Sequence, residues 1–477
     1  MTELRILAPV VVDYYAVPGA SLRDPRAYAQ FWAKQQPAVD ELLELLVPDS
    51  VNEGPGTSPA VVLEHTRATS SLNLYRTISD HAVERTFHVL TGKLAPEHLP
   101  GEFGGAIDAL HVGVTEIGFR LYDHGLMLLE LLADVQRSLT EPNDGLEAHL
   151  DDLQARAVTM GERVARETVQ RYLNPVLDLL RQADRDEQIL VAATPAGDPV
   201  TAEFGESLWV TRSLVVDPSE SGIERVVRHW VKDVVTAGDG ETTPADRLLD
   251  GDLDHLVRWL NYIFMDRTGA GGRMLPGDPF RDQWDALRYA QVFYGVLDRI
   301  DTRLSKIVAD SAAPASRWDL EQLKGQLMSL SKRAELIIME RRDLSKYLKR
   351  AVRVEMDAIL EFWDYENVLE QPVRFKIEIC DRRLAELASR RTARSTMFTD
   401  LILLGIGVTS ILGTALAVTE FGRSIASDPG TAIYDLGQSS AMEWIAAQPA
   451  DAILITSGLV SVLLVLVYLF FRRDNGS

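Results

Sequence analysis

The chain has 477 residues, and its formal net charge at pH 7 is −21. This length exceeds that of a usual single domain, so we expect two or three structural units, each with its own core. The excess of acidic side chains argues against a general nucleic-acid-binding protein, because phosphate backbones are bound by basic surfaces. The single cysteine, Cys380, excludes a disulfide framework within one chain.

Residues 1–140 are predicted to form an N-terminal α+β domain. The segment "MTELRILAPVVVDYY" is typical of a first strand and not of a secretion signal, because its apolar core is interrupted by Asp13 and no basic segment precedes it. The pattern predicts a helix over 24–47 and a second strand over 59–66. This mixed order favours an α+β head with antiparallel sheets.

Residues 141–270 are predicted to form a second α+β region. A long helix or helix pair over 143–185 precedes two strand-like segments, "DEQILVAAT" and "SLWVTRSLVV". The segments 71–87 and 207–227 share the pattern S-L-x-x-x-R-[ST]-[IL], followed by an aliphatic residue and Glu-Arg. This match suggests that the second region repeats the first, and a chance match is the alternative.

Residues 278–395 are predicted to form a long helical stalk. Apolar residues recur at heptad positions a and d from Leu320 across 317–370, which predicts a coiled coil about seven heptads long. Arg341 and Glu355 interrupt position a, where polar residues can fix the register or the number of subunits. The alternative is a helix that packs on its own chain. A single helix of this length would span roughly 80 Å, which favours a stalk, and Pro372 marks a break after it.

Two apolar runs, 397–418 and 452–471, predict a C-terminal transmembrane helical hairpin over 397–471. Each run has about twenty residues, enough to cross a bilayer core. Arginines beside both runs place the two termini in the cytoplasm and the protein in the plasma (inner) membrane. These membrane-flanking residues are Arg390, Arg391, Arg394, Arg472 and Arg473. A buried pair of core helices is the alternative.

Small side chains recur at every fourth position of the first apolar run, at Gly405, Thr409, Gly413 and Ala417. This spacing lines one helix face and lets another helix approach closely. The face would pack the hairpin against itself or would pack between subunits around a pore, with Asp400 near the inner mouth.

The sequence contains no clear constellation for catalysis, and we expect no enzyme, no catalytic residue, no cofactor and no metal site. His124 beside Asp123 is a candidate acid/base pair, although a turn between two strands also explains Asp-His-Gly. Cys380 lacks the sequence context of a protease nucleophile. The glycine-rich segment at 268–277 lacks the Gly-Lys-Ser/Thr ending of a phosphate-binding loop.

The predicted order of an α+β head, a long helix, two spans and a short basic tail resembles the CorA class of magnesium channels. That resemblance implies a pentameric divalent cation channel. The class carries Gly-Met-Asn after its first span, whereas this chain has "TEFGRS" there. The departure puts magnesium selectivity in doubt.

The opening "APVVVDYYAVPG" with "AYAQFW", the mixed head, the helical second half and the C-terminal hairpin also resemble the CATRA proteins. This is the caspase and TPR repeat-associated family of bacterial conflict systems. The resemblance implies a membrane effector or scaffold that works beside a caspase-like protease or a TPR protein. It carries over no functional residue.

Two functions therefore compete. In the first, the chain is a membrane-anchored effector or scaffold of bacterial defence that forms homo-oligomers through its stalk and permeabilises the lipid bilayer when triggered. In the second, it is a divergent CorA-like divalent cation channel without Gly-Met-Asn. A tethered scaffold without conduction is a third interpretation, and no nucleic-acid partner is expected.

Overall fold

The computed structural model divides the chain into two compact units, 1–380 and 381–477. It describes these residues: 2–12, 14–16, 25–46, 59–63, 88–99, 112–122, 124–135, 145–186, 189–192, 207–232, 243–267, 279–311, 317–344, 348–427, 440, 444, 447–449, 451–452 and 455–463.

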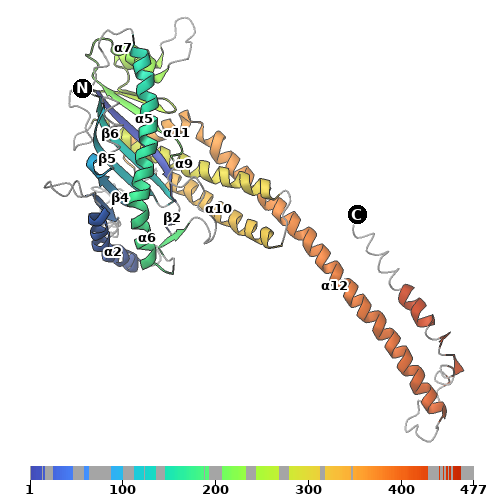
Figure 1. The fold of residues 1–477 in the computed structure, drawn as a ribbon. Coiled ribbons are helices and arrows are strands. Elements are labelled where there is room, and N and C mark those ends of the chain that lie inside the picture. Colours follow the sequence, from blue (N-terminus) through green and yellow to red (C-terminus); the bar gives the residue numbers. More distant parts are fainter. Residues whose placement is uncertain are drawn as a thin grey trace. The chain divides into compact units, whose positions relative to one another are not determined.

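The first unit is built on an eight-stranded sheet with the order β3-β4-β5-β6-β1-β8-β10-β9 (Figure 1). Its strands are β1 (Thr2–Val11), β3 (Ala60–Leu63), β4 (His88–Leu94), β5 (Val112–Tyr122), β6 (Leu126–Val135), β8 (Thr211–Val216), β9 (His255–Val257) and β10 (Asn261–Met265). All neighbours are antiparallel except β8 and β10, which are parallel. A separate pair joins β2 (Tyr14–Ala16) to β7 (Leu190–Ala192).

Strand β1 lies at the centre of this sheet, and all ten of its residues are buried. It pairs with β6 over its full length and with β8, so strands from the predicted regions 1–140 and 141–270 form one sheet. The prediction of a first strand at the N-terminus is confirmed. The proposed repeat stays a prediction, because 71–87 lies outside the described residues.

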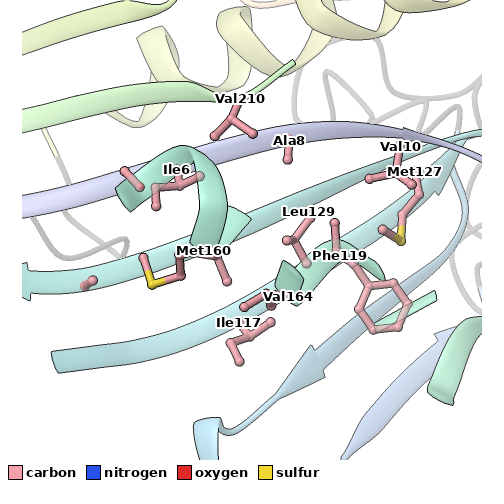
Figure 2. Packing of buried hydrophobic residues seen from close by; sticks show 14 of the residues in the cluster. Ile6, Ala8, Val10, Ile117, Phe119, Met127, Leu129, Met160, Val164 and Val210 are labelled. Carbon is pink, nitrogen blue, oxygen red and sulfur yellow. The ribbon is translucent and has the colours of Figure 1, made fainter. Parts of the chain in front are cut away.

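One face of the sheet carries an apolar core covered by helices. These helices are α2 (Pro25–Leu46), α5 (Leu146–Thr168), α6 (Asn174–Ala183) and α7 (Ile223–Val231). Figure 2 shows Ile6, Ala8 and Val10 of β1 on the side where α5 presents Met160 and Val164. Alternate residues of a strand point to the same face, which explains why these three residues share the core.

The other face carries the helical layer, which we define as α9 (Arg281–Asp310), α10 (Arg317–Leu344) and α11 (Arg350–Phe362) (Figure 1). Helix α9 packs against β1 and β6, and α10 and α11 each pack against α9. The shorter described elements are α8 (Pro244–Asp250) and η2 (Pro96–His98).

Two five-residue π-helical segments lie inside long helical stretches, η3 (Val169–Leu173) and η4 (Glu366–Glu370). Each ends one residue before an X-Pro pair, which contains Pro175 in one case and Pro372 in the other. Proline has no N–H and its ring collides with the carbonyl four residues earlier, so a wider turn lets the chain stay helical. This explains why Pro372 does not end the helical path.

The predicted single stalk over 317–370 is wrong, because this segment is divided among α10, α11 and η4. The heptad residues of α10 are nevertheless buried. Those with less than a tenth of their surface exposed include Leu320, Leu323, Leu327, Leu330, Ala334, Ile337 and Leu344. The apolar stripe of α10 therefore packs within its own chain, which was the alternative interpretation.

Helix α12 (Gln371–Ser427) carries the chain from the first unit into the second. In the first unit it contains the buried Val373 and Cys380. Lys376 of α12 binds Asp301 of α9, with Nζ 2.6 Å from Oδ2.

The predicted transmembrane hairpin is contradicted. Among the residues that the structure describes, no helix is long and apolar enough to cross a membrane. The predictions of a transmembrane protein, of a pore and of an inner-membrane location are contradicted with it.

Candidate functional site

A buried ionic network joins α9 to the centre of the sheet. Its side chains come from β5, β6 and α9: Arg120, Glu130, Asp285 and Arg288. Glu130 forms ion pairs with Arg120 and with Arg288, whose Nε lies 2.7 Å from Oε1 of Glu130. The network contains two arginines and two carboxylates, so its formal charges cancel.

The carboxylates of this network have shifted pKa values. Burial raises the pKa of Glu130, but the positive charges of Arg120 and Arg288 outweigh burial and leave this pKa below its usual value. For Asp285, burial outweighs the same two arginines and raises the pKa. The network therefore holds Glu130 as a charged anchor for both arginines.

A second contact between the sheet and α9 joins Arg5 of β1 to an aromatic ring. The Arg5 guanidinium carbon lies 5.6 Å from the ring centre of Trp284, within the range of a cation–π contact, and both side chains are fully buried. Arg5 also pairs with Glu3 of the same strand. Because Glu3 and Arg5 are two positions apart, they point to the same face, opposite the core of Figure 2.

The turn between β5 and β6 is fastened to α10. His124 Nε2 lies 2.5 Å from Oε2 of Glu340, and Arg333 Nη2 donates a hydrogen bond of 2.6 Å to the His124 carbonyl. Gly125 has φ +74°, and a Cβ there would lie 3.0 Å from the Tyr14 carbonyl oxygen. The turn interpretation of Asp-His-Gly is confirmed. Asp123 lies outside the described residues, and the partner of His124 is Glu340.

A cavity of about 10 Å³ lies beside this turn. It is lined by His124, Gly125, Leu126, Val296, Arg299, Ile300, Arg303, Leu330 and Arg333. A volume of this size holds no more than one water molecule. His124 therefore fastens two layers at this site, and the space beside it is too small for a substrate.

Helix α11 is fastened to the sheet by a second histidine and carboxylate. His255 Nε2 of β9 lies 2.7 Å from Oε1 of Glu355, and the His255 ring stacks on Phe264. Glu355 was predicted to set the register of a coiled coil. The other predicted register residue, Arg341, has Nη1 3.4 Å from Oε2 of Glu370 and lies over the ring of Tyr365. Both residues thus have partners inside their own chain.

Aromatic rings fill the space between the β9–β10 turn, α9 and α11. The Tyr294 ring has edge contacts with Trp209, Trp259 and Trp363 at centroid distances of 5.0 to 5.5 Å. Burial raises the pKa of Tyr294 to about 12, so its hydroxyl stays protonated at neutral pH. Trp259 keeps 42% of its surface exposed, which makes it the part of this cluster that a partner can reach.

Gln291 of α9 ties the aromatic cluster to the sheet. Trp209 Nε1 donates to Gln291 Oε1 at 2.6 Å, and Gln291 Nε2 donates to Thr211 Oγ1 at 2.5 Å. Gln291 is fully buried, so both of its polar atoms have partners away from water.

The outer side of α11 is apolar although its inner side already packs on α9. Val352, Met356 and Ile359 are buried inward. The outward residues include Val354, with 57% of its surface exposed, and Phe362, with 49% exposed. Arg258 lies over the Phe362 ring, with 5.6 Å between the guanidinium carbon and the ring centre. We call Ala351, Val354, Ala358, Phe362 and the neighbouring Trp259 the α11 surface.

The predicted small-residue face lies on α12 in the second unit. Gly405, Thr409, Gly413 and Ala417 are exposed, and a Cβ added at Gly405 or Gly413 would meet no described atom within 4 Å. Thr409 Oγ1 donates to the Gly405 carbonyl at 3.0 Å, within its own helix.

The remaining predicted residues of this region lie outside the described side chains. Asp400, Arg390, Arg391 and Arg394 belong to α12, but their side chains are not described, and Arg472 and Arg473 lie beyond the described part of the chain. Whether the small-residue face packs between subunits stays a prediction.

In the part of the chain that the structure describes, no group of three His, Cys, Asp or Glu side chains is arranged to hold a metal ion. No protein family, no curated protein and no solved structure matches this chain.

The ionic network and the two contacts between a histidine and a glutamate were not predicted from the sequence, because their members are far apart in the chain. The α11 surface could have been predicted, because Ala351, Val354, Ala358 and Phe362 are spaced by three or four residues and therefore share one face of a helix.

Proposed function

We propose that this chain is an assembly protein, a scaffold or effector without catalytic activity, that binds another protein through the α11 surface. The observation that supports the proposal is the exposure of Val354 and Phe362 on α11 and of Trp259 in the neighbouring β9–β10 turn. Exposed aromatic side chains beside an arginine have the composition of an interface hot spot.

The base beneath this surface supports the same function. Trp363 and Tyr365 are buried against Tyr294, and Glu355 holds α11 to His255. Lys349, just before α11, also binds Asp282 of α9 at 3.0 Å. A surface that is already ordered loses little conformational entropy when a partner binds.

We propose a bacterial conflict system as the setting, on the resemblance to the CATRA proteins. A caspase-like protease or a TPR protein is then a candidate partner beside further copies of the chain. Permeabilisation and conduction required the transmembrane hairpin, so neither is part of this proposal.

A photo-reactive phenylalanine analogue at position 354 of the full chain tests the assembly function in cells. We expect a discrete adduct with one protein, which is then purified and shown to bind the wild-type chain and not Phe362→Asp. The same analogue at Glu335, an exposed position of α10, serves as the control. No adduct at 354, or equal adducts at both positions, would contradict the proposal.

A further inference from the structure

We propose that the α11 surface binds the α11 surface of a second copy of this chain, with the two helices antiparallel about a two-fold axis that crosses the outer side of α11 between Val354 and Ala358. This inference rests on the proposed assembly function and names its partner.

The apolar residues of α11 fit an antiparallel copy of themselves. Ala351, Val354, Ala358 and Phe362 are spaced by three, four and four residues, so they lie on one face of the helix. An antiparallel partner centred near residue 356 places Phe362 opposite Ala351 and Val354 opposite Ala358. Each large side chain then meets a small one, which allows close packing.

The charges of α11 fit the same arrangement. Arg350 and Arg353 lie in the first turn, and Asp357 and Glu361 lie in the second half. An antiparallel copy brings Arg350 toward Glu361 at both ends of the pair. A parallel copy would instead place like charges together.

This order of charges opposes the dipole of the helix itself. The positive end of the dipole lies at the N-terminus, where α11 has arginines and no acidic residue in the first turn. Its last turn contains no basic residue. This order of charges does not stabilise an isolated helix, whereas it gives an antiparallel pair favourable charge contacts at both ends.

Two further charged residues, one beside α11 and one within it, already have partners in their own chain. Lys349 binds Asp282, and Glu355 points toward His255 on the sheet side. The exposed Trp259, 5.5 Å from Trp363 between ring centres, extends the surface beyond the C-terminal end of α11. It would lie against the N-terminal turn of the second copy.

Charge reversal in the full chain tests this pairing by sedimentation equilibrium. Arg350→Glu and Glu361→Arg each create two like-charge contacts in a symmetric pair, so each variant should self-associate at least about tenfold more weakly than wild type. Each change also agrees with the helix dipole, so neither variant should lose stability. Lys332→Glu, an exposed reversal on α10, is the matched control.

An equal mixture of the two variants provides the decisive arm. In the mixed pair both charge contacts have opposite signs, so association should return to within about threefold of wild type. The pairing would be overturned if the single variants associated as strongly as wild type, or if the mixture associated no more strongly than either variant alone. If position 354 captures a different protein whose binding needs Phe362, the assembly function stands and the self-pairing fails. If it captures nothing, the assembly function itself fails.

Discussion

The carboxylate of Glu340 in α10 lies 2.5 Å from the imidazole of His124, in the turn between β5 and β6. The two residues are 216 positions apart, and their contact fastens the helical layer to one end of the central hairpin. Glu355 and His255 form the equivalent contact for α11. Two helices expected to extend away from the head are thus held against it.

Glu340→Ala removes the partner of a buried imidazole. We expect the free energy of unfolding to fall by about 1–2 kcal/mol, because hydrogen bonds that involve a charged group contribute somewhat more than neutral ones. Urea unfolding measures this loss. Glu335→Ala, five residues away and exposed, should change stability by less than about 0.5 kcal/mol. Equal effects of the two substitutions would show that the contact with His124 does not stabilise the fold.

Glu130→Gln leaves Arg120 and Arg288 buried without their shared carboxylate. We expect a loss of about 3 kcal/mol or more at neutral pH, measured by urea unfolding. Glu116→Gln, in the exposed pair with Lys93, is the control and should cost less than about 1 kcal/mol.

The stability that Glu130→Gln removes should depend on pH. Because the pKa of Glu130 is lower in the folded than in the unfolded chain, its stabilisation is complete above the unfolded value of about 4.3. It is lost as the pH falls through the folded value. The stability difference between wild type and Glu130→Gln should therefore shrink as the pH is lowered from about 7 to about 3. A difference that grew toward low pH would contradict the lowered pKa.

Gly161→Leu inserts a side chain where α5 approaches the sheet. A Cβ at this position would lie 3.0 Å from Cγ1 of Val210 and 3.2 Å from Cγ2 of Ile6, both of which are stiff β-branched side chains. We expect a loss of about 1–3 kcal/mol, seen as a lower Tm. Gly325→Leu on α10, where a Cβ meets nothing within 4 Å, should instead stabilise by about 0.5–1 kcal/mol. Matching signs for the two variants would contradict the close approach.

Gln291→Met keeps the length of the side chain but removes both of its polar atoms. Trp209 Nε1 and Thr211 Oγ1 then lose the partners they have in the interlayer contact. We expect about 2 kcal/mol of destabilisation in urea and a change in tryptophan fluorescence. Unchanged stability would show that these groups find other partners.

Local structure could be predicted from the sequence, whereas contacts between distant parts of the chain could not. Alternation and turn signals located the first strand, the β5–β6 turn and the helix at 24–47, because these depend on residues close together in the chain. The heptad pattern from Leu320 predicted an apolar helix face, but such a face can pack against a helix of another chain or against α9 of the same chain. The tertiary contacts of Arg341 and Glu355 show that these two residues have partners in their own chain.

The membrane prediction depended on hydropathy and on the arginines that flank the two apolar runs. Run length and flanking arginines suggested two spans, whereas no described helix is long and apolar enough to cross a membrane. The ionic network was unpredictable for a different reason. Its carboxylates and arginines come from β5, β6 and α9, and the packing of α9 on the sheet that brings them together cannot be read from local patterns.

Sedimentation equilibrium of the full chain beside Phe362→Asp, at matched concentrations, tests the role of the α11 surface most directly. Phe362 is 49% exposed, so its replacement should leave the melting temperature nearly unchanged. The account predicts reversible self-association of the wild type and an association at least about tenfold weaker for the variant. Equal association of the two proteins, or a wild-type chain that stays monomeric at every concentration, would contradict assembly of copies through α11.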